Sequence, residues 1–273
     1  MKLQAKLYRA AVYLGAAFTL SVLLLIVGYI LVNGIPHLSP ELFAWKYTSE
    51  NVSMLPALIN TLLMTLLSLL VCVPLGIGAA IYLTEYAKRG SHLVRLIRMT
   101  AETLSGIPSI IYGLFGSLFF VVALRMGMSL LSGALTLSIM VLPTILRTTE
   151  EALLSVPDSY REGSFGLGAG RLRTTFQVVL PSAMPGILSG VILSIGRIAG
   201  ETAALIYTAG TVAKVPASPL DSARTLAVHM YAISTEGLYV NQSYATAVVL
   251  LVMVLCINAL SGFIAKRIGR RHP

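Results

Sequence analysis

The stretch EGSFGLGAGRLRTTFQVVLP, residues 162–181, interrupts an otherwise apolar sequence with charges and closely spaced glycines. Just upstream, Pro157 suits the first turn of a helix. From there the pattern predicts a short helix over 160–167, closed by the glycines, and a second over 172–180 that ends at Pro181. Two short helices joined by a glycine corner would form a knob that projects from the rest of the chain, and such a knob needs a soluble partner to be useful.

The composition of the whole chain is typical of an integral membrane protein. Of the 273 residues, 56% are hydrophobic and only 11% are charged, and the mean hydropathy is +0.83. A soluble domain of this size would carry far more charge on its surface. The composition therefore excludes a soluble globular protein.

Several segments are long and apolar enough to cross a bilayer core about 30 Å thick, which takes about 20 residues per helix. They cover residues 11–33, 55–86, 104–124, 129–146, 183–212 and 244–265. The first is too long for the apolar region of a secretory signal and has no small-residue cleavage pattern after it, so we interpret it as a retained helix. The predicted fold is an all-α polytopic membrane protein with about six transmembrane helices.

The distribution of lysine and arginine predicts the orientation. When the loops are assigned alternately to two sides, one side holds Lys2, Lys6, Arg9, Lys88, Arg89, Arg95, Arg98, Arg147, Arg161, Arg171, Arg173, Lys266, Arg267, Arg270 and Arg271, and the other holds only Lys46, Arg125, Lys214 and Arg224. Basic loops stay in the cytoplasm, so both termini and the knob are predicted inside. The same rule explains the net charge of +9 more simply than binding to nucleic acid does.

Two long loops, 34–54 and 213–243, fall on the opposite side and are large enough to form an external docking surface. Within the second, residues 220–233 are compatible either with a short interfacial helix or with a loop that packs down onto the protein.

Ionisable residues at membrane depth are costly and usually mark function. Arg197 and Glu201 fall inside the fifth predicted span, one turn apart, where they could neutralise each other. An arginine fork can bind an oxyanion through two parallel hydrogen bonds, so Arg197 is the first candidate for contact with a transported anion. Arg147, with Glu151 four residues on, is the second.

Each of these assignments has a structural alternative. Arg197 and Glu201 could simply be an ion pair that holds the bundle together, and Arg147 could extend from a helix end to the membrane surface. Gly186, Gly190, Gly196 and Gly200 could bring a second membrane subunit close to Arg197 or could serve helix packing alone.

No catalytic or metal-binding constellation is present in the sequence. The histidines His37, His92, His229 and His272 are scattered without the spacing of metal ligands. Cys72 and Cys256 both lie in apolar segments and are interpreted as small buried hydrophobic residues rather than a disulfide. We therefore expect a protein that is not an enzyme.

The opening stretch resembles the E-A-A-x3-G-x9-I-x-L-P signature of importer permeases in the ATP-binding-cassette (ABC) superfamily. The spacing is intact, and the changes replace alanines by Gly163 and Ser164 and isoleucine by Val178. In that family the knob is a coupling helix that sits in a groove of a cytoplasmic ATPase. The resemblance implies ATPase coupling by Arg161, Glu162, Gly163, Ser164, Gly168, Leu180 and Pro181. No Walker A run is present, so ATP and magnesium are expected on separate subunits and no cofactor on this chain.

Further stretches resemble the phosphate-importing branch of this family: residues 34–43, 106–116, 142–152 and 196–210. The resemblance implies a multi-pass protein of the bacterial cytoplasmic membrane that contacts lipid and works with a second, similar permease, two ATPase subunits and an external phosphate-binding protein. It divides the chain into a first helix with its outer loop (1–54), a transmembrane core (55–265) containing the coupling segment 147–181, and a basic cytoplasmic tail (266–273).

Other functions are compatible with the same features. An ABC importer for sulfate or molybdate would share the architecture and the arginine. An ion-coupled secondary transporter or an anion channel would also place arginine and glutamate in the membrane, but it would not need the coupling segment.

Overall fold

The computed structural model describes residues 2–88 and 90–269, and every regular element in these ranges is helical. The α-helices are α1 (Lys2–Gly34), α2 (Leu55–Ile81), α3 (His92–Ser105), α4 (Ser109–Gly116), α5 (Leu130–Leu154), α6 (Asp158–Gly166), α7 (Arg171–Thr174), α8 (Leu180–Ala199), α9 (Ala203–Thr208), α10 (Leu226–Thr235) and α11 (Val240–Gly269). Short 3-10 or π turns are η1 (Ile35–His37), η2 (Pro40–Phe43), η3 (Tyr82–Tyr86), η4 (Ser117–Ala123) and η5 (Thr175–Val179). The predicted all-α membrane fold is confirmed.

Five helical segments are long and apolar enough to span a membrane, and a sixth arises if one bent pair counts as a single span. The second predicted span matches the segment Leu55–Tyr86. The fourth was predicted too short, because α5 continues to Leu154. Residues 147–154, assigned from the sequence to the coupling segment, are thus the last two turns of a span.

The third span was predicted as one helix, and this is wrong. The segments His92–Ser105 and Ser109–Ala123 meet at an angle of 104°. Pro108 is extended, with φ −58° and ψ 140°, and a proline disfavours helical geometry in the residue before it. The break at 106–108 therefore follows from local chemistry that a hydropathy pattern does not register.

The fifth span, predicted over 183–212, is shifted toward the knob. The helical course runs from Arg171 to Ala199, and the short α9 follows after a break at 200–202. The second knob helix does not end at Pro181 as predicted. Pro181 instead occupies the first turn of α8, where its missing N–H costs little.

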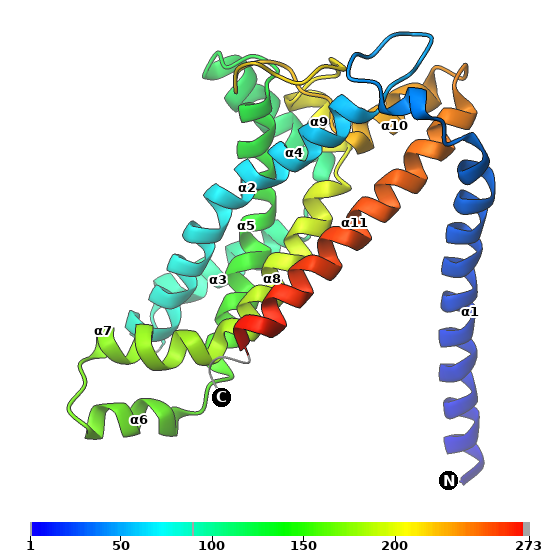
Figure 1. Ribbon diagram of the computed structural model, residues 1–273. Coiled ribbons are helices and arrows are strands. Elements are labelled where there is room, and N and C mark those ends of the chain that lie inside the picture. Colours follow the sequence, from blue (N-terminus) through cyan, green and yellow to red (C-terminus); the bar gives the residue numbers. More distant parts are fainter. Residues whose placement is uncertain (1, 89, 270–273) are drawn as a thin grey trace.

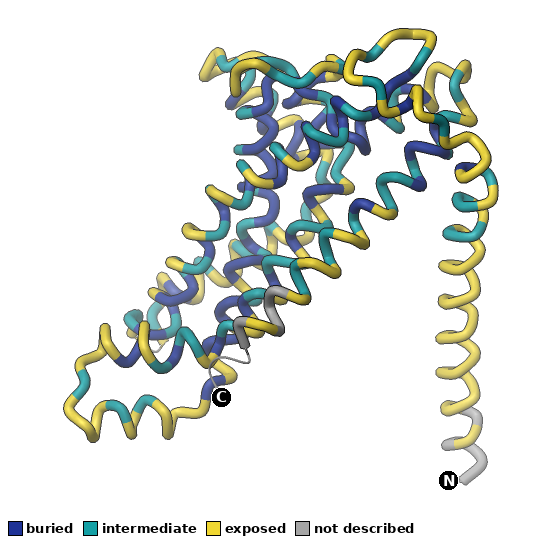
Figure 2. Tube along the Cα trace, in the orientation of Figure 1, coloured by how far each residue is buried: buried dark blue, intermediate teal, exposed yellow. Residues whose placement is uncertain are grey.

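The core of the bundle lies where α5 packs between α2 and α8 (Figures 1 and 2). Leu137, Met140 and Ile145 of α5 are all at most 1% exposed. Glycines allow the close approach of α8: a β-carbon at Gly186 would lie 2.7 Å from Ala152 Cβ, and one at Gly190 would overlap Thr148. Packing within this chain therefore accounts for these two glycines.

The substitution Gly190→Ala is expected to destabilise the chain. The added methyl would collide with Thr148, whose hydroxyl is held by a hydrogen bond of 2.9 Å to the Thr144 carbonyl. Overpacking of this kind costs about 1–3 kcal/mol, or about 2–4 °C in unfolding temperature per kcal/mol. Gly196→Ala on the same helix is the control, because its nearest neighbour, Asn258, lies 3.7 Å away. Equal unfolding temperatures for the two variants in detergent would contradict this packing.

Helix α1 stands apart from the bundle (Figures 1 and 2). It contacts α11 only near its end, where Gly34 lies against the Tyr244 carbonyl and the Tyr29 and Tyr244 rings meet edge to face at 5.8 Å. None of its most apolar window is buried. Cys256 of α11 is also exposed, so only Cys72 is the buried hydrophobic residue that the sequence predicts; both cysteines are free.

The loop 213–243 contains a real helix, α10, but it does not lie on the surface. Leu226, Val228, His229 and Ile233 are fully buried against the neighbouring helices. His229 Nδ1 lies 3.3 Å from the Arg224 guanidinium, and its ring meets Tyr47 edge to face at 5.9 Å. Burial lowers the pKa of His229 from 6.5 to about 4; the Arg224 charge lowers this pKa too, and the Val52 backbone acts in the opposite direction.

The folded state is expected to lose stability through His229 as the pH is lowered. In the unfolded chain this imidazole takes up a proton near pH 6.5, whereas in the folded chain it does so only near pH 4. Its contribution is complete above pH 6.5 and is lost as the pH falls from 6.5 to 4, by up to about 3 kcal/mol. His229→Asn should flatten the pH dependence of the unfolding temperature, while His92→Asn on the exposed side of α3 should not. An unchanged slope in His229→Asn would contradict the shift.

The start of α1 and the end of α11 lie at the same end of the molecule as α6 and α7 (Figure 1). This arrangement agrees with the prediction that the termini and the knob share one side, and which compartment they face stays a prediction. Arg89, Arg270 and Arg271 of the positive-inside pattern, and residues 270–273 of the predicted basic tail, lie outside the described residues.

Candidate functional site

The predicted knob is formed by α6 and α7, which lie outside the bundle (Figure 1). The corner between them turns at Gly168, whose φ of +81° is in the left-handed region that favours glycine. The Ser164 and Thr174 hydroxyls join the two helices at 2.9 Å. Glu162 and Gly163 are exposed on α6, and Leu180 and Pro181 are half-buried where α8 enters the bundle.

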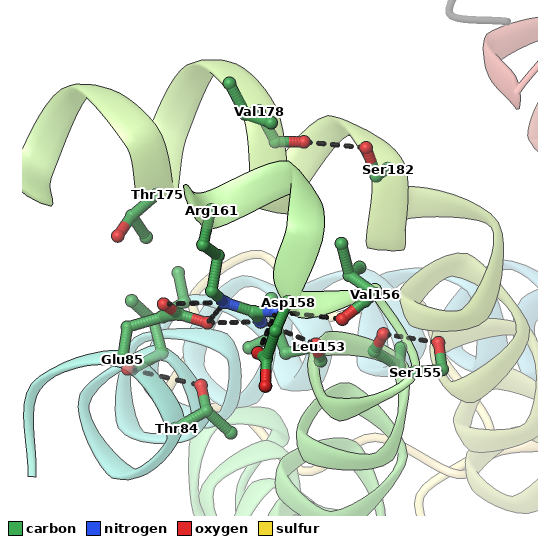
Figure 3. A network of polar contacts seen from close by, with 12 residues as sticks. Thr84, Glu85, Leu153, Ser155, Val156, Asp158, Arg161, Thr175, Val178 and Ser182 are labelled. Carbon is green, nitrogen blue, oxygen red and sulfur yellow. Dashed lines mark hydrogen bonds and ion pairs between the residues drawn. The ribbon is translucent and has the colours of Figure 1, made fainter. Parts of the chain in front are cut away.

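Arg161 is turned inward, and it is the most heavily bonded side chain of the knob (Figure 3). Its guanidinium forms an ion pair with Glu85 at 2.7 Å, donates to the carbonyls of Leu153 at 2.9 Å and Val156 at 2.8 Å, and contacts Asp158 at 3.3 Å. The Arg161 and Glu85 side chains are only 15% and 9% exposed. Arg161 therefore ties α6 to the ends of two spans, α2 with η3 and α5.

Apolar side chains cover the outside of the knob. Tyr160 is 53% exposed, Phe165 47% and Leu167 91%. Large exposed hydrophobic residues gathered at one place mark an interaction surface. The sequence motif contains Arg161, which turns inward, whereas these neighbouring residues form the outer face.

The substitution Gly168→Asp is expected to weaken this surface. An aspartate at φ +81° costs about 1 kcal/mol or more, so the corner would shift to relieve it. Gly170→Asp is the control, because Gly170 has an ordinary φ of −74°. Pull-down of the cognate ATPase should weaken for Gly168→Asp alone, and equal retention by both variants would show that the corner geometry is unimportant for docking.

Arg197 lies in the last turn of α8 and is exposed on the chain. Glu201 lies beyond the helix end, in the break before α9, and its Oε1 accepts a hydrogen bond of 3.1 Å from the Ala204 amide. No ion pair joins Arg197 to a carboxylate among the described residues. The prediction that the two residues share one helix is wrong, because Glu201 caps α9 instead.

Two broken helices meet beside Arg197. Gly113 of α4 approaches the backbone of Ala204 in α9, where a β-carbon would lie 2.7 Å away. Tyr112 donates a hydrogen bond of 2.8 Å to the Leu104 carbonyl across the bend between α3 and α4. Irregular backbone at membrane depth is typical of places where it lines a cavity.

Asn258 of α11 is a polar residue near this place that the sequence analysis did not single out. It lies against Gly196, beside Arg197, and its Oδ1 has no hydrogen-bond partner among the described residues. A lone asparagine in an apolar helix was the available signal, since the amide has to find a partner in the membrane.

Arg147 and Glu151, four residues apart on α5, form an ion pair at 3.0 Å, and their side chains are 59% and 64% exposed. Arg147 is not at a helix end, because α5 continues for two further turns. Nearby, Arg98 of α3 forms an ion pair at 2.5 Å with the buried Glu150, which the sequence analysis missed. These charges line a cleft of about 280 Å³ between α3 and α5.

Arg147 and Arg197 lie at different levels of the bundle. Thr148, next to Arg147, contacts Gly190 of α8, and Arg197 is seven residues farther along that helix, or about 10 Å. The structure therefore brings each arginine to its own level rather than joining both in one site. In the described residues, no cluster of histidine, cysteine and acidic side chains could hold a metal ion.

Comparisons with known proteins agree with this architecture. The family model described as "Binding-protein-dependent transport system inner membrane component" matches residues 72–271. The probable ABC transporter permease protein YqgI of Bacillus subtilis is 33% identical, over 99% of this chain and 98% of the relative. The phosphate transport system permease protein PstA of Pasteurella multocida is 34% identical, over 94% of this chain and 92% of the relative.

A solved structure shares the fold. A chain of a bacterial alginate ABC transporter, crystallised in complex with an alginate-bound periplasmic protein, aligns with a TM-score of 0.70 at 16% identity, over 98% of this chain and 99% of that chain. The family match, the near full-length relatives and the projecting knob lead to one conclusion. The chain belongs to the binding-protein-dependent transport system inner membrane component family, as a multi-pass permease subunit of an ABC transporter in the inner membrane.

Proposed function

We propose that this chain is the permease subunit of an ATP-driven importer of inorganic phosphate and forms half of the translocation pathway. The observation that carries the proposal is Arg197, a cation in an apolar span with no described carboxylate partner. Phosphate offers several acceptor oxygens to a guanidinium fork. The likeness to PstA of Pasteurella multocida supports phosphate as the anion.

In this proposal the pathway has two levels. An anion that enters from the outer end meets Arg197 first and reaches Arg147 about 10 Å farther inward. Arg147 is held by Glu151 at 3.0 Å, so an arriving anion has to compete with that carboxylate. Such competition keeps binding weak enough for release. Glu201 acts indirectly, since it fixes the break between α8 and α9 and leaves Arg197 unneutralised.

A second, similar permease completes the pathway. Arg197 is exposed on this chain, and α1 leaves its apolar surface uncovered. A charged group cannot face lipid without a large cost, so a partner subunit has to cover the side of the bundle that carries Arg197. The two permeases then enclose the anion between them.

The other partners follow from the two ends of the molecule. Two ATPase subunits hold ATP and magnesium. They bind the knobs of the two permeases through outer faces such as the one that Tyr160, Phe165 and Leu167 form on this chain. A soluble phosphate-binding protein docks on the outer loops and delivers the anion. This chain contributes no cofactor site and acts as a transport subunit rather than an enzyme.

The main alternative is an importer of another oxyanion, because a guanidinium also fits sulfate or molybdate. The experiment that separates these functions is uptake of radiolabelled phosphate by the reconstituted complex, with excess unlabelled sulfate, molybdate or phosphate as competitor. We expect competition by phosphate alone. Equal competition by sulfate or molybdate would assign the permease to a different oxyanion.

A further inference from the structure

A cavity of about 620 Å³ lies beside α6, at the end of the bundle that carries the knob. It is bounded by η3, the turn after it, α3, the end of α5 and α6. Its wall contains four cationic side chains: Lys88, Arg98, Arg161 and Arg171. The cavity shares Phe165 with the outer face of the knob and Arg98 with the cleft beside Arg147, but Lys88 and Arg171 belong to neither of those sites.

Two of the four cations are neutralised within the chain. Arg98 pairs with Glu150 at 2.5 Å, and Arg161 pairs with Glu85 at 2.7 Å. These two arginines shape the wall and have little capacity left for a ligand.

Lys88 and Arg171 have no ion pair with a carboxylate among the described residues. Lys88 is exposed, and the Arg171 guanidinium lies 5.5 Å from the centre of the Tyr86 ring. Asp158 also lines the cavity but contacts Arg161. Set against the carboxylates of Glu85, Glu150 and Asp158, the four cations leave a net charge of about +1 at the cavity, and this net positive charge suits an anionic ligand.

The position of the cavity, beside the ends of two candidate spans, suits the level of lipid headgroups. Two candidate spans, Leu55–Tyr86 and Leu130–Leu154, end at its wall. In the cavity wall itself, Leu154 and Phe165 are 60% and 47% exposed. Apolar side chains at this level fit the acyl chains of a lipid, and a basic pocket between spans fits its headgroup.

We propose that this cavity binds the phosphodiester headgroup of an anionic phospholipid, with Lys88 and Arg171 on the phosphate and the acyl chains against the exposed Leu154 and Phe165. Inorganic phosphate shares the charge chemistry, but it would gain nothing from these exposed apolar side chains. Because Arg161 of the knob lines the same cavity, a bound headgroup would stiffen the junction between α6 and the spans.

The test is native mass spectrometry of the full chain, released from zwitterionic lipid doped with phosphatidylglycerol. We expect retained phosphatidylglycerol in the wild type. Lys88→Gln/Arg171→Gln should weaken binding about 30-fold, because each basic side chain contributes about fivefold to the attraction of an anionic lipid. The control Lys6→Gln/Arg267→Gln removes one lysine and one arginine from the same end of the folded molecule (Figure 1), outside the cavity, and should retain the lipid.

A second variant, Lys88→Arg/Arg171→Lys, keeps both charges and should retain the lipid even if the glutamine variant folds poorly. The proposal fails if the glutamine variant binds as the wild type does, or if the control loses as much binding as that variant. It also fails if millimolar inorganic phosphate displaces the lipid completely, which would assign a free-anion site. Loss of the lipid when the ATPase is assembled would assign the cavity to the ATPase interface.

Discussion

Replacement of Arg197 by glutamine is expected to lower phosphate uptake by the assembled transporter at least about 100-fold. The substitution removes the two charge-assisted hydrogen bonds that a guanidinium offers to an oxyanion, and each contributes about 1.5–3 kcal/mol. Arg197→Lys should be intermediate, since it keeps the charge and loses the fork. The measurement is initial uptake rate in proteoliposomes that contain equal amounts of complex.

The control for lost charge is Arg125→Gln. Arg125 is exposed and lies on the predicted outer side of the molecule. It should transport as the wild type does. Binding of the ATPase and the unfolding temperature should be unchanged in Arg197→Gln, because this side chain has no ion pair within the described residues to lose. Normal uptake by Arg197→Gln would show that the residue is structural, although membership of the permease family would stand.

The second large effect is expected at the buried pair of Arg161 and Glu85. Removing one partner leaves the other charge buried and uncompensated, which costs about 3–5 kcal/mol. Arg161→Gln and Glu85→Gln should each lower the unfolding temperature and the amount of phosphate moved per ATP, because α6 would no longer be tied to α2 and α5.

The double variant Arg161→Gln/Glu85→Gln distinguishes a coupling clamp from general destabilisation. With both charges removed, part of the stability should return, since no unpaired charge remains. The transport-to-ATP ratio should stay low, because the bonds from Arg161 to the Leu153 and Val156 carbonyls are still missing. Recovery of the ratio together with stability would contradict a role in transmitting motion.

Hydropathy predicted most of the fold, because membrane spans need apolar length and little else. It failed where a span is broken. Pro108 and the sequence Gly200–Thr202 each interrupt a helix. Both lie inside apolar segments whose hydropathy predicts one unbroken span. The four-residue spacing of Arg197 and Glu201 was therefore misleading, because the helix ends between them and Glu201 binds the Ala204 amide.

The coupling motif predicted the knob, including the corner at Gly168, because left-handed backbone geometry strongly favours glycine and is therefore visible in the sequence. It did not predict the direction of Arg161, which depends on Glu85, a residue 76 positions away. The Arg98–Glu150 pair was missed for the same reason, since ion pairs between different helices have no fixed spacing. The ion pair of Arg147 and Glu151 forms because α5 continues past residue 146 and places both residues on one helix, one turn apart.

An ATP-driven importer is distinguished most directly by phosphate uptake into liposomes, measured with this chain alone and with the complex of both permeases, ATPase and binding protein. We expect uptake only by the complete complex, only with ATP, and in proportion to ATP hydrolysed. Phosphate movement by the chain alone, without ATP, would contradict this expectation and identify a channel or a secondary transporter.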